Sequence, residues 1–133
     1  MGMVLVVDDD DDIRDIVALV VRRRGFEVHS SADPVAALDV AAERGFTAAV
    51  LDWSMPEMNG GELCARLRDL PGLEQAPIVI LTAYADAETR AQAYAAGATR
   101  FVTKPFSLTD LGDLLVGLVG AVPAEDGPAA PTS

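Results

Sequence analysis

Residues 3–9 read Met-Val-Leu-Val-Val-Asp-Asp, a run of aliphatic side chains that ends on a pair of acidic residues. An unbroken apolar run of this length is typical of a strand covered on both faces, as in a parallel sheet. Longer segments of helical periodicity separate it from four similar short runs, at residues 26–30, 48–51, 78–81 and 100–103. This alternation predicts an α/β fold with a five-stranded, doubly wound parallel sheet flanked by five helices.

The helical segments carry start and stop signals. Ile13, Ile16, Val17 and Val20 recur at helical spacing and predict the buried face of the first helix, which Gly25 should end as a left-handed cap. Three further helices should begin where a polar side chain can accept a hydrogen bond from a backbone N–H group of the first turn, at Asp33 before Pro34, at Asn59 with Glu62, and at Ser107 with Asp110. An Ala-rich helix should lie between Asp86 and Ala96 and end at Gly97.

The composition indicates one globular domain. The chain has 133 residues, half of them hydrophobic, and a formal net charge of −11. So large an acidic excess disfavours nucleic acid and anionic membranes as partners, because binding them depends on lysine and arginine. A single cysteine and the lack of a membrane-length apolar run favour a cytoplasmic location. We expect the domain to cover residues 1–120, and the Pro- and Ala-rich residues 121–133 to form a disordered tail or linker.

Polar side chains stand where four of the predicted strands end. Asp8 and Asp9 follow the first strand, Asp52 the third, Thr82 the fourth, and Lys104, the only lysine of the chain, the fifth. Because the carboxyl ends of parallel strands meet at one edge of the sheet, these side chains should lie close together. Three neighbouring carboxylates stay ionised only beside a cation, and oxygen ligands suit Mg²⁺. Such an edge would accommodate a phosphoryl group, which an aspartate could accept as an aspartyl phosphate.

Each of these residues also has a plain structural interpretation. A run of acidic residues is often a solvated helix start, where it interacts favourably with the helix dipole. Asp52 alone could be a turn residue, and Thr82 alone an ordinary strand-end threonine. The combination of these residues at four strand ends favours a functional site over the separate explanations.

Five segments resemble the receiver domain of two-component response regulators, and of the single-domain, chemotaxis-type regulators in particular. The resemblance extends from Met3 to about Leu118 and implies a flavodoxin-like fold. The segments that carry it are residues 4–9 (VLVVDD), 49–60 (AVLDWSMPEMNG), 78–83 (IVILTA), 95–98 (AAGA) and 101–106 (FVTKPF).

The resemblance implies a phosphoacceptor and a Mg²⁺ site. Asp52 would be the phosphoacceptor. Asp9, Asp52 and the backbone carbonyl of Ser54 would bind Mg²⁺ directly, and Asp8 would help to place the metal through a water molecule. Residues 10–12 depart from the family by adding acidic charge beyond the usual pair, and we predict that they strengthen divalent binding or make it less selective.

The resemblance also implies a switch. Lys104 would contact the phosphoryl oxygens, and its bond to Pro105 would be cis. Thr82 would move inward to hydrogen-bond the phosphoryl group, and Phe101, where many relatives carry Tyr, would follow it into the vacated space.

By the same resemblance the chain would be a signalling protein of a two-component system. A histidine kinase or phosphotransfer protein would donate the phosphoryl group. The domain would catalyse only transfer onto itself and slow loss of the group, so it would not be an enzyme in the usual sense. A downstream protein would bind the face formed by the fourth helix, fifth strand and fifth helix, with no nucleic acid or membrane bound by this domain.

Two alternatives remain beside the stand-alone receiver that we expect. The chain could be the receiver of a longer DNA-binding or enzymatic response regulator, with residues 121–133 as the linker. A haloacid-dehalogenase-like phosphohydrolase also uses an aspartyl nucleophile. Those enzymes usually place a second Asp two residues later, where this chain has Ser54, and they need a cap domain for which the chain has no length. The sequence does not identify the kinase, the output, the oligomeric state or the phosphoryl lifetime.

Overall fold

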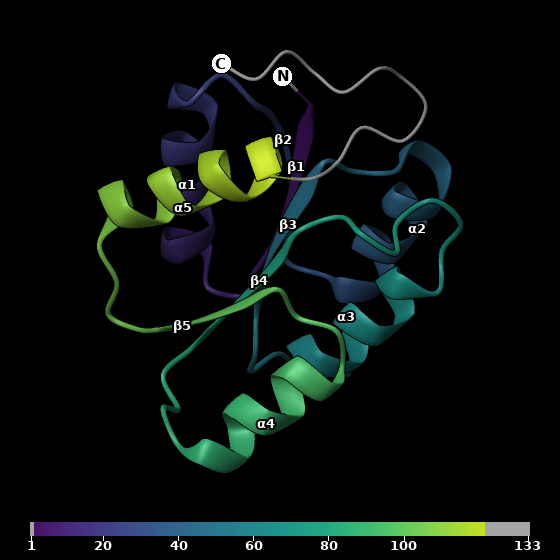
Figure 1. Ribbon diagram of the computed structural model, residues 1–133, viewed down its shortest axis with the longest axis vertical. Coiled ribbons are helices and arrows are strands. Elements are labelled where there is room, and N and C mark those ends of the chain that lie inside the picture. Colours follow the sequence, from purple (N-terminus) through teal and green to yellow (C-terminus); the bar gives the residue numbers. More distant parts are fainter. Residues whose placement is uncertain (1, 122–133) are drawn as a thin grey trace.

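A computed structural model describes residues 2–121, which form one parallel sheet with helices on both faces (Figure 1). The sheet order is β2-β1-β3-β4-β5, so the chain reverses direction across the sheet after β2, as in other doubly wound folds. The strands are β1 (Met3–Val7), β2 (Glu27–Ser31), β3 (Ala48–Asp52), β4 (Ile78–Thr82) and β5 (Arg100–Thr103). The helices are α1 (Asp11–Arg23), α2 (Pro34–Arg44), α3 (Gly60–Arg68), α4 (Ala87–Ala95) and α5 (Leu108–Ala121).

The predicted fold class is therefore confirmed. Residues 122–133, nearly all of the predicted tail, lie outside the described residues, and α5 extends one residue past the predicted domain boundary at residue 120. None of the described helices is both long and apolar enough to cross a membrane.

The three central strands are buried along their whole length, as their sequences predict. The edge strand β2 differs: it begins at Glu27 rather than at Phe26, and none of its residues is fully buried. Phe26 itself is 4% exposed and packs in the core just before the strand. An edge strand has only one neighbour and partial cover, so it needs no continuous apolar sequence.

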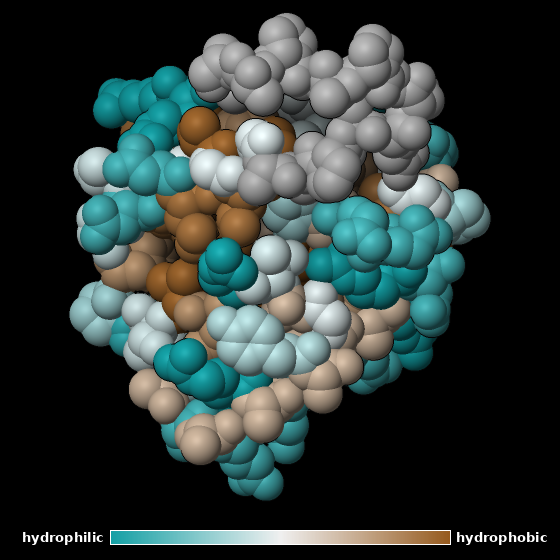
Figure 2. Space-filling model, in the orientation of Figure 1, coloured by the Kyte–Doolittle hydropathy of each residue, from teal (hydrophilic) through white to brown (hydrophobic). Residues whose placement is uncertain are grey.

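Two hydrophobic clusters hold the helices to the sheet. On one face Leu5, Leu51 and Ile80 pack with residues of α2, α3 and α4. On the other face Val6 and Leu81 pack with residues of α1 and α5. Figure 2 shows hydrophobic side chains reaching the surface over α5, while hydrophilic side chains cover much of the rest of this view.

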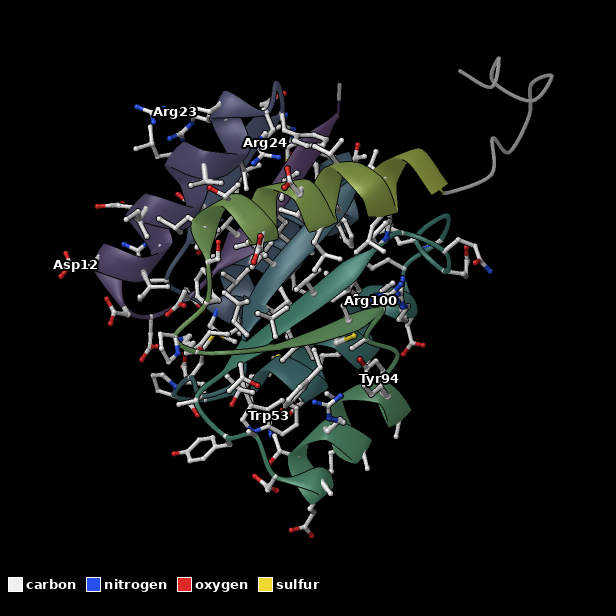
Figure 3. All side chains as sticks on the ribbon, turned by 60° about the vertical axis from the view of Figure 1, so that its left-hand side comes forward. Asp12, Arg23, Arg24, Trp53, Tyr94 and Arg100 are labelled. Atoms are coloured by element: carbon white, nitrogen blue, oxygen red, sulfur yellow. The ribbon has the colours of Figure 1, made fainter. Side chains whose placement is uncertain are left out.

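The buried face of α1 agrees with the predicted one at Val17 and Ile13, which pack in the core, but not at Ile16. Val17, Ala18 and Val21 are buried, whereas Ile16 is 41% exposed. Apolar residues surround much of this helix, so periodicity alone could not choose the face that packs on the sheet. Figure 3 shows Asp12 and Arg23 near opposite ends of α1, both pointing away from the sheet.

The predicted helix signals are present. Asp33 and Asn59 each accept a hydrogen bond from a first-turn backbone N–H group, at 2.9 and 2.8 Å. Asp86, which was not predicted as a cap, does the same for α4 at 2.9 Å. The hydroxyl of Ser107 accepts from the N–H of Asp110 at 3.1 Å. Gly25 follows α1 with a φ of 95°, a left-handed conformation that glycine adopts without steric cost. Local capping thus fixes where the helices begin and end.

Candidate functional site

Four strand ends bring the polar side chains together. Asp8 directly follows β1, Asp52 ends β3, Thr82 ends β4 and Lys104 directly follows β5. Because β1, β3, β4 and β5 are successive neighbours in the sheet, these positions share one edge. A cleft at this edge is lined by Asp8, Asp9, Asp10, Asp52, Ser54, Ala83, Tyr84 and Lys104.

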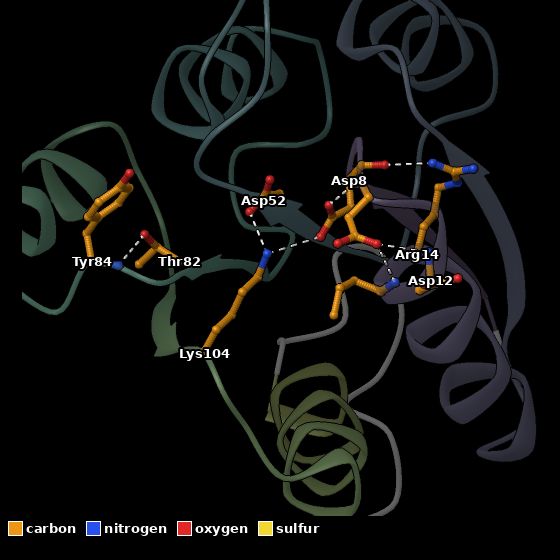
Figure 4. Close-up of polar contacts among 9 residues, drawn as sticks. Asp8, Asp12, Arg14, Asp52, Thr82, Tyr84 and Lys104 are labelled. Atoms are coloured by element: carbon orange, nitrogen blue, oxygen red, sulfur yellow. Dashed lines mark hydrogen bonds and ion pairs between the residues drawn. The ribbon is translucent and has the colours of Figure 1, made fainter.

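The acidic residues and the lysine form one ionic cluster (Figure 4). Carboxylate oxygens of Asp8, Asp9 and Asp52 all lie within 4.8 Å of one another. The Nζ atom of Lys104 donates to Oδ1 of Asp52 at 2.9 Å and lies 3.5 Å from Oδ2 of Asp8. Asp8 is 2% and Asp52 5% exposed, whereas Asp9 lies on the surface. Two of the three acids are thus buried at the edge of the sheet, and the third, Asp9, is exposed to solvent.

Burial dominates the electrostatics of the cluster. It raises the pKa of Asp52 to about 6, although the hydrogen bond from Lys104 opposes this shift. Burial also raises the pKa of Asp8, against the N–H group of Asp10 and the charge of Lys104. For Lys104, burial alone would lower the pKa, but the hydrogen bond to Asp52 and the charges of both acids together raise it. One lysine therefore does not fully neutralise the acids, and a further cation would stabilise their ionised forms.

The donor set fits a hard divalent cation. Three carboxylates with oxygens this close, on an open cleft that admits water, are the ligands that Mg²⁺ takes in proteins. Ser54, whose carbonyl the sequence suggested as a further ligand, lines the same cleft. The residues present thus match the chemistry of a magnesium site.

The two predicted switch residues lie on one face of the sheet. Phe101 is the register partner of Ile80, and Thr82 stands two residues after Ile80, so the two side chains are diagonal neighbours. The Thr82 hydroxyl accepts a hydrogen bond from the N–H group of Tyr84 at 2.9 Å. Within residues 2–121 it forms no hydrogen bond to the side chains of Asp52 or Lys104. Thr82 therefore belongs to the site by position, without a hydrogen bond to the Asp52 or Lys104 side chain.

A model of one protein family, described as the response regulator receiver domain, matches residues 4–115. The chain belongs to this family. The membership argues against the haloacid-dehalogenase-like alternative. Receiver domains are in general signalling switches of two-component systems, not enzymes acting on other substrates, and they bind Mg²⁺ at an aspartate cluster.

Individual relatives of this receiver domain differ in length. It is 34% identical over 104 residues to the transcriptional regulatory protein SrrA of Staphylococcus aureus, covering 78% of this chain but only 42% of that protein. It is 33% identical to the Vibrio cholerae chemotaxis protein CheY4, with a TM-score of 0.84, covering 89% of this chain and 98% of that structure. The chain thus spans less than half of the first relative and nearly all of the second.

A third relative carries the metal. The receiver domain of the sensor histidine kinase PA1611 from Pseudomonas aeruginosa is 25% identical, with a TM-score of 0.82, and covers 90% of this chain and 98% of that structure. Its structure holds a magnesium ion coordinated in the active-site cleft.

The additional aspartates of this receiver domain have local structural partners. Asp10 is the N-cap of α1, where its side chain accepts from the N–H groups of Asp12 and Ile13 at 2.9 and 3.2 Å. Asp11 pairs with Arg14 at 2.6 Å. Capping followed by an i,i+3 ion pair gives two of these acids a local structural role. Their effect on divalent binding stays a prediction.

Sequence reasoning missed two arginines near the functional residues. Arg14 donates to the backbone carbonyl of Asp8 at 2.8 Å and so holds the loop that carries the acidic pair (Figure 4). The Arg90 guanidinium lies 5.1 Å from the ring centroid of Phe101, which is itself 9% exposed. The spacing of Ile13-Arg14 after the acidic pair was visible in the sequence, but its contact was not. A cation over an aromatic ring on another element leaves no sequence signal.

The loop between β3 and α3 turns sharply beside Asp52. Glu57 has a φ of 74°, and the N–H of Met58 donates to the carbonyl of Pro56 at 2.8 Å, as in a γ-turn. The N–H of Gly60 then donates to the carbonyl of Trp53 at 2.9 Å. These contacts place the start of α3 against the end of β3. They also hold the backbone of the loop that follows Asp52 in one conformation. The Lys104–Pro105 bond, on the opposite side of the cleft, is cis.

Proposed function

We propose that this receiver domain accepts a phosphoryl group on Asp52 from a phosphohistidine of a histidine kinase or phosphotransfer protein. The observation that supports this most directly is the cluster itself. Asp52 is nearly buried, Lys104 lies 2.9 Å from it, and two further carboxylates lie within 4.8 Å. A buried carboxylate beside an ammonium group is suited to nucleophilic attack on a phosphoryl group, because the ammonium can neutralise the incoming charge.

In the proposed reaction an oxygen of Asp52 forms a bond to phosphorus while the bond from phosphorus to the donor imidazole nitrogen breaks. The nitrogen keeps the electron pair. Asp8, Asp9, Asp52 and the carbonyl of Ser54 would hold Mg²⁺, which when bound neutralises charge on the phosphoryl oxygens. Lys104 would transfer its hydrogen bond from the carboxylate of Asp52 to a phosphoryl oxygen. The chain would thus catalyse its own phosphorylation and slow dephosphorylation only.

The same proposal gives Thr82 and Phe101 the role of a switch. Thr82 would exchange the N–H group of Tyr84 for a phosphoryl oxygen, and the adjacent ring of Phe101 would respond. Because Arg90 of α4 covers that ring, a movement of Phe101 would reach the surface formed by α4, β5 and α5. On that surface a groove between β5 and α5 is lined by Arg100, Asp110, Asp113, Leu114, Gly117 and Leu118, and we infer that a downstream protein binds there.

The phosphodonor should bind beside the acidic cleft. A mainly apolar groove formed by Ile13, Ile16, Pro105, Phe106 and Leu108 adjoins Lys104 and Ala83, which also line the cleft. A donor that carries its phosphohistidine to Asp52 must cover this edge, so its own apolar side chains would bury the groove.

How this receiver domain passes on its signal has two candidate answers. The first candidate is a receiver of residues 1–120 that acts alone, as the resemblance to CheY4 suggests, with residues 121–133 as a tail or linker. Coverage of 42% of SrrA supports the second candidate, a receiver within a longer transcriptional regulator. Proteins that co-purify with the phosphorylated domain, but not with Asp52→Asn, would distinguish a protein partner from a missing output domain. The cytoplasmic location stays a prediction.

Labelling with acetyl phosphate tests the acceptor assignment. The wild-type domain should take up about one phosphoryl group in a Mg²⁺-dependent reaction, and Asp52→Asn should take up none, because an amide is not a nucleophile for phosphorus. Asp39→Asn changes an exposed residue of α2 and serves as the matched control, which should label like the wild type. Full labelling of Asp52→Asn would refute the assignment.

A further inference from the structure

The outer face of α1 carries two apolar side chains between charges of opposite sign. Ile16 is 41% and Leu19 46% exposed. Asp12 precedes Ile16 by one turn, and Arg23 follows Leu19 by one turn. At 3.6 residues per turn these four residues form one stripe, opposite the side of α1 that packs on the sheet. Figure 3 shows the two charged ends of the stripe directed into solvent.

The stripe is complementary to itself. Ile16 and Leu19 are equally far from the point midway between Val17 and Ala18, and so are Asp12 and Arg23, which lie about 17 Å apart at 1.5 Å per residue. If a second α1 is laid antiparallel on the first, Asp12 meets Arg23 of the second copy and Ile16 meets its Leu19. A two-fold axis then repeats both contacts. Asp15 and Arg22 flank the stripe on a common side, and the same axis brings Asp15 to within about 3 Å, along the helix axis, of Arg22 of the second copy.

We propose that this receiver domain forms a two-fold symmetric dimer through antiparallel contact of α1 with α1 of a second copy. The helix dipole accounts for acids at the start and arginines at the end of a helix. It does not account for the two large apolar side chains exposed between them, of which the groove proposed for the phosphodonor includes Ile16 but not Leu19. The charged residues of the stripe and its flank also lack ion-pair partners within residues 2–121. They are Asp12, Asp15, Arg22 and Arg23.

The contact should be weak and sensitive to salt. One helix pair buries less surface than the roughly 1,200–2,000 Å² of a stable complex, so we expect association at protein concentrations of about 0.1–1 mM. Its exposed ion pairs are screened as ionic strength rises, which weakens the dimer further. Because the dimer covers Ile16, which also lines the groove beside Lys104, it would compete with the phosphodonor proposed above.

Sedimentation velocity over about 0.02–1 mM protein at low salt tests the dimer. The wild type should shift from monomer to dimer. Arg23→Asp should weaken association by at least about tenfold, because a two-fold contact contains the reversed pair twice. The exchanged variant Asp12→Arg with Arg23→Asp should recover association, although its charges now oppose the helix dipole at both ends. Arg66→Asp, an exposed arginine on α3, is the control and should behave as wild type.

Circular dichroism of each variant verifies the helical fold. A wild type that stays monomeric up to about 1 mM overturns the proposal. So does a dimer that Arg23→Asp leaves unchanged, or an exchanged variant that stays monomeric. Labelling of Asp52 by acetyl phosphate is measured separately, so loss of the dimer and loss of the proposed phosphoacceptor function are distinguishable.

Discussion

Lys104 and Asp52, 52 residues apart in the chain, are joined by a hydrogen bond of 2.9 Å at the carboxyl edge of the sheet. The lysine side chain is 22% and the aspartate side chain 6% exposed, so water screens this pair only in part. Lys104 also lies 3.5 Å from Asp8, which makes it the shared counter-charge of two buried acids. The ammonium group therefore occupies a place where it competes with any other cation for the same oxygens.

Lys104→Met should separate metal binding from phosphorylation. Removal of the ammonium group frees both carboxylates and ends its repulsion of a divalent cation, so Mg²⁺ should bind at least about threefold more tightly. Labelling by acetyl phosphate should slow by at least about tenfold, because no side chain then neutralises the phosphoryl oxygens. Calorimetric Mg²⁺ titration and labelling rates measure the two effects. Wild-type labelling in this variant would show that Lys104 does not act on the phosphoryl group.

The raised pKa of Asp52 predicts a stability gain for Asp52→Asn. The folded-state pKa of about 6 exceeds the ordinary value of 3.8, so the carboxyl favours folding when protonated and that contribution is lost as pH rises through about 6. Without metal at pH 8, the neutral Asn variant should therefore unfold with a free energy about 2–3 kcal/mol higher than the wild type. The Asn side-chain oxygen can still accept from Lys104.

Urea unfolding in EDTA measures this difference. At pH 5 the wild-type carboxyl is largely protonated in the folded state, so the advantage of the variant should shrink to about half. Added Mg²⁺ should stabilise the wild type more than the variant, because the metal binds the ionised carboxylate. Equal stabilities at pH 8 without metal would show that burial of Asp52 costs little.

Much of the site could be predicted from the sequence, because the end of each strand is marked by the residues that directly follow its apolar run. An aliphatic run followed by Asp8 and Asp9, and another ending at Asp52, places these acids on one edge once the sheet is parallel. The capping residues Asp33 and Asn59 act within their own first turns, so their patterns were also sufficient.

The rest depends on contacts between distant segments. Ile16 and Val17 are equally apolar, and only the packing of α1 on the sheet decides that Val17 is buried and Ile16 exposed. The contacts of Arg68 also join segments that are distant in the sequence. Arg68 binds backbone carbonyls, which every residue carries, so no pattern of side chains predicts its partners.

Gly60→Ala should damage the site through the backbone. A Cβ atom at Gly60 would collide with the carbonyl oxygen of Asp52 and lie 3.1 Å from the Cα atom of Trp53. Neither atom can move without shifting β3, so we expect a loss of about 2–3 kcal/mol in the free energy of unfolding and weaker Mg²⁺ binding. Denaturant unfolding and calorimetry measure both.

Gly117→Ala is the matched control for this prediction. It lies in α5 with no atom within 4 Å of the added Cβ. Because alanine restricts the unfolded chain and favours helix, this variant should gain about 0.5–1 kcal/mol with unchanged metal binding. A Gly60→Ala protein as stable as the wild type would mean that α3 can move away from β3 at little cost.

Arg68→Met should destabilise the end of the molecule opposite the site. The Arg68 guanidinium donates to the carbonyls of Leu73, Ala76 and Gly97 at 2.5–3.0 Å and to the hydroxyl of Thr99 at 3.2 Å. It thereby ties the end of α3 to the segments that lead into β4 and β5. Methionine keeps much of the side-chain volume but leaves these acceptors without their donor, so the free energy of unfolding should fall by about 2–3 kcal/mol.

Arg66→Met supplies the comparison on the same helix. In the described part of the chain Arg66 pairs only with Glu62, and both side chains are about half exposed, at 55% and 50%. An exposed i,i+4 pair contributes little, so this variant should stay within about 0.5 kcal/mol of the wild type. Urea unfolding of the two variants then compares one arginine bound to partly buried carbonyls with one bound in solvent. Equal losses would mean that side-chain volume or helix propensity, not the carbonyl contacts, gives Arg68 its effect on stability.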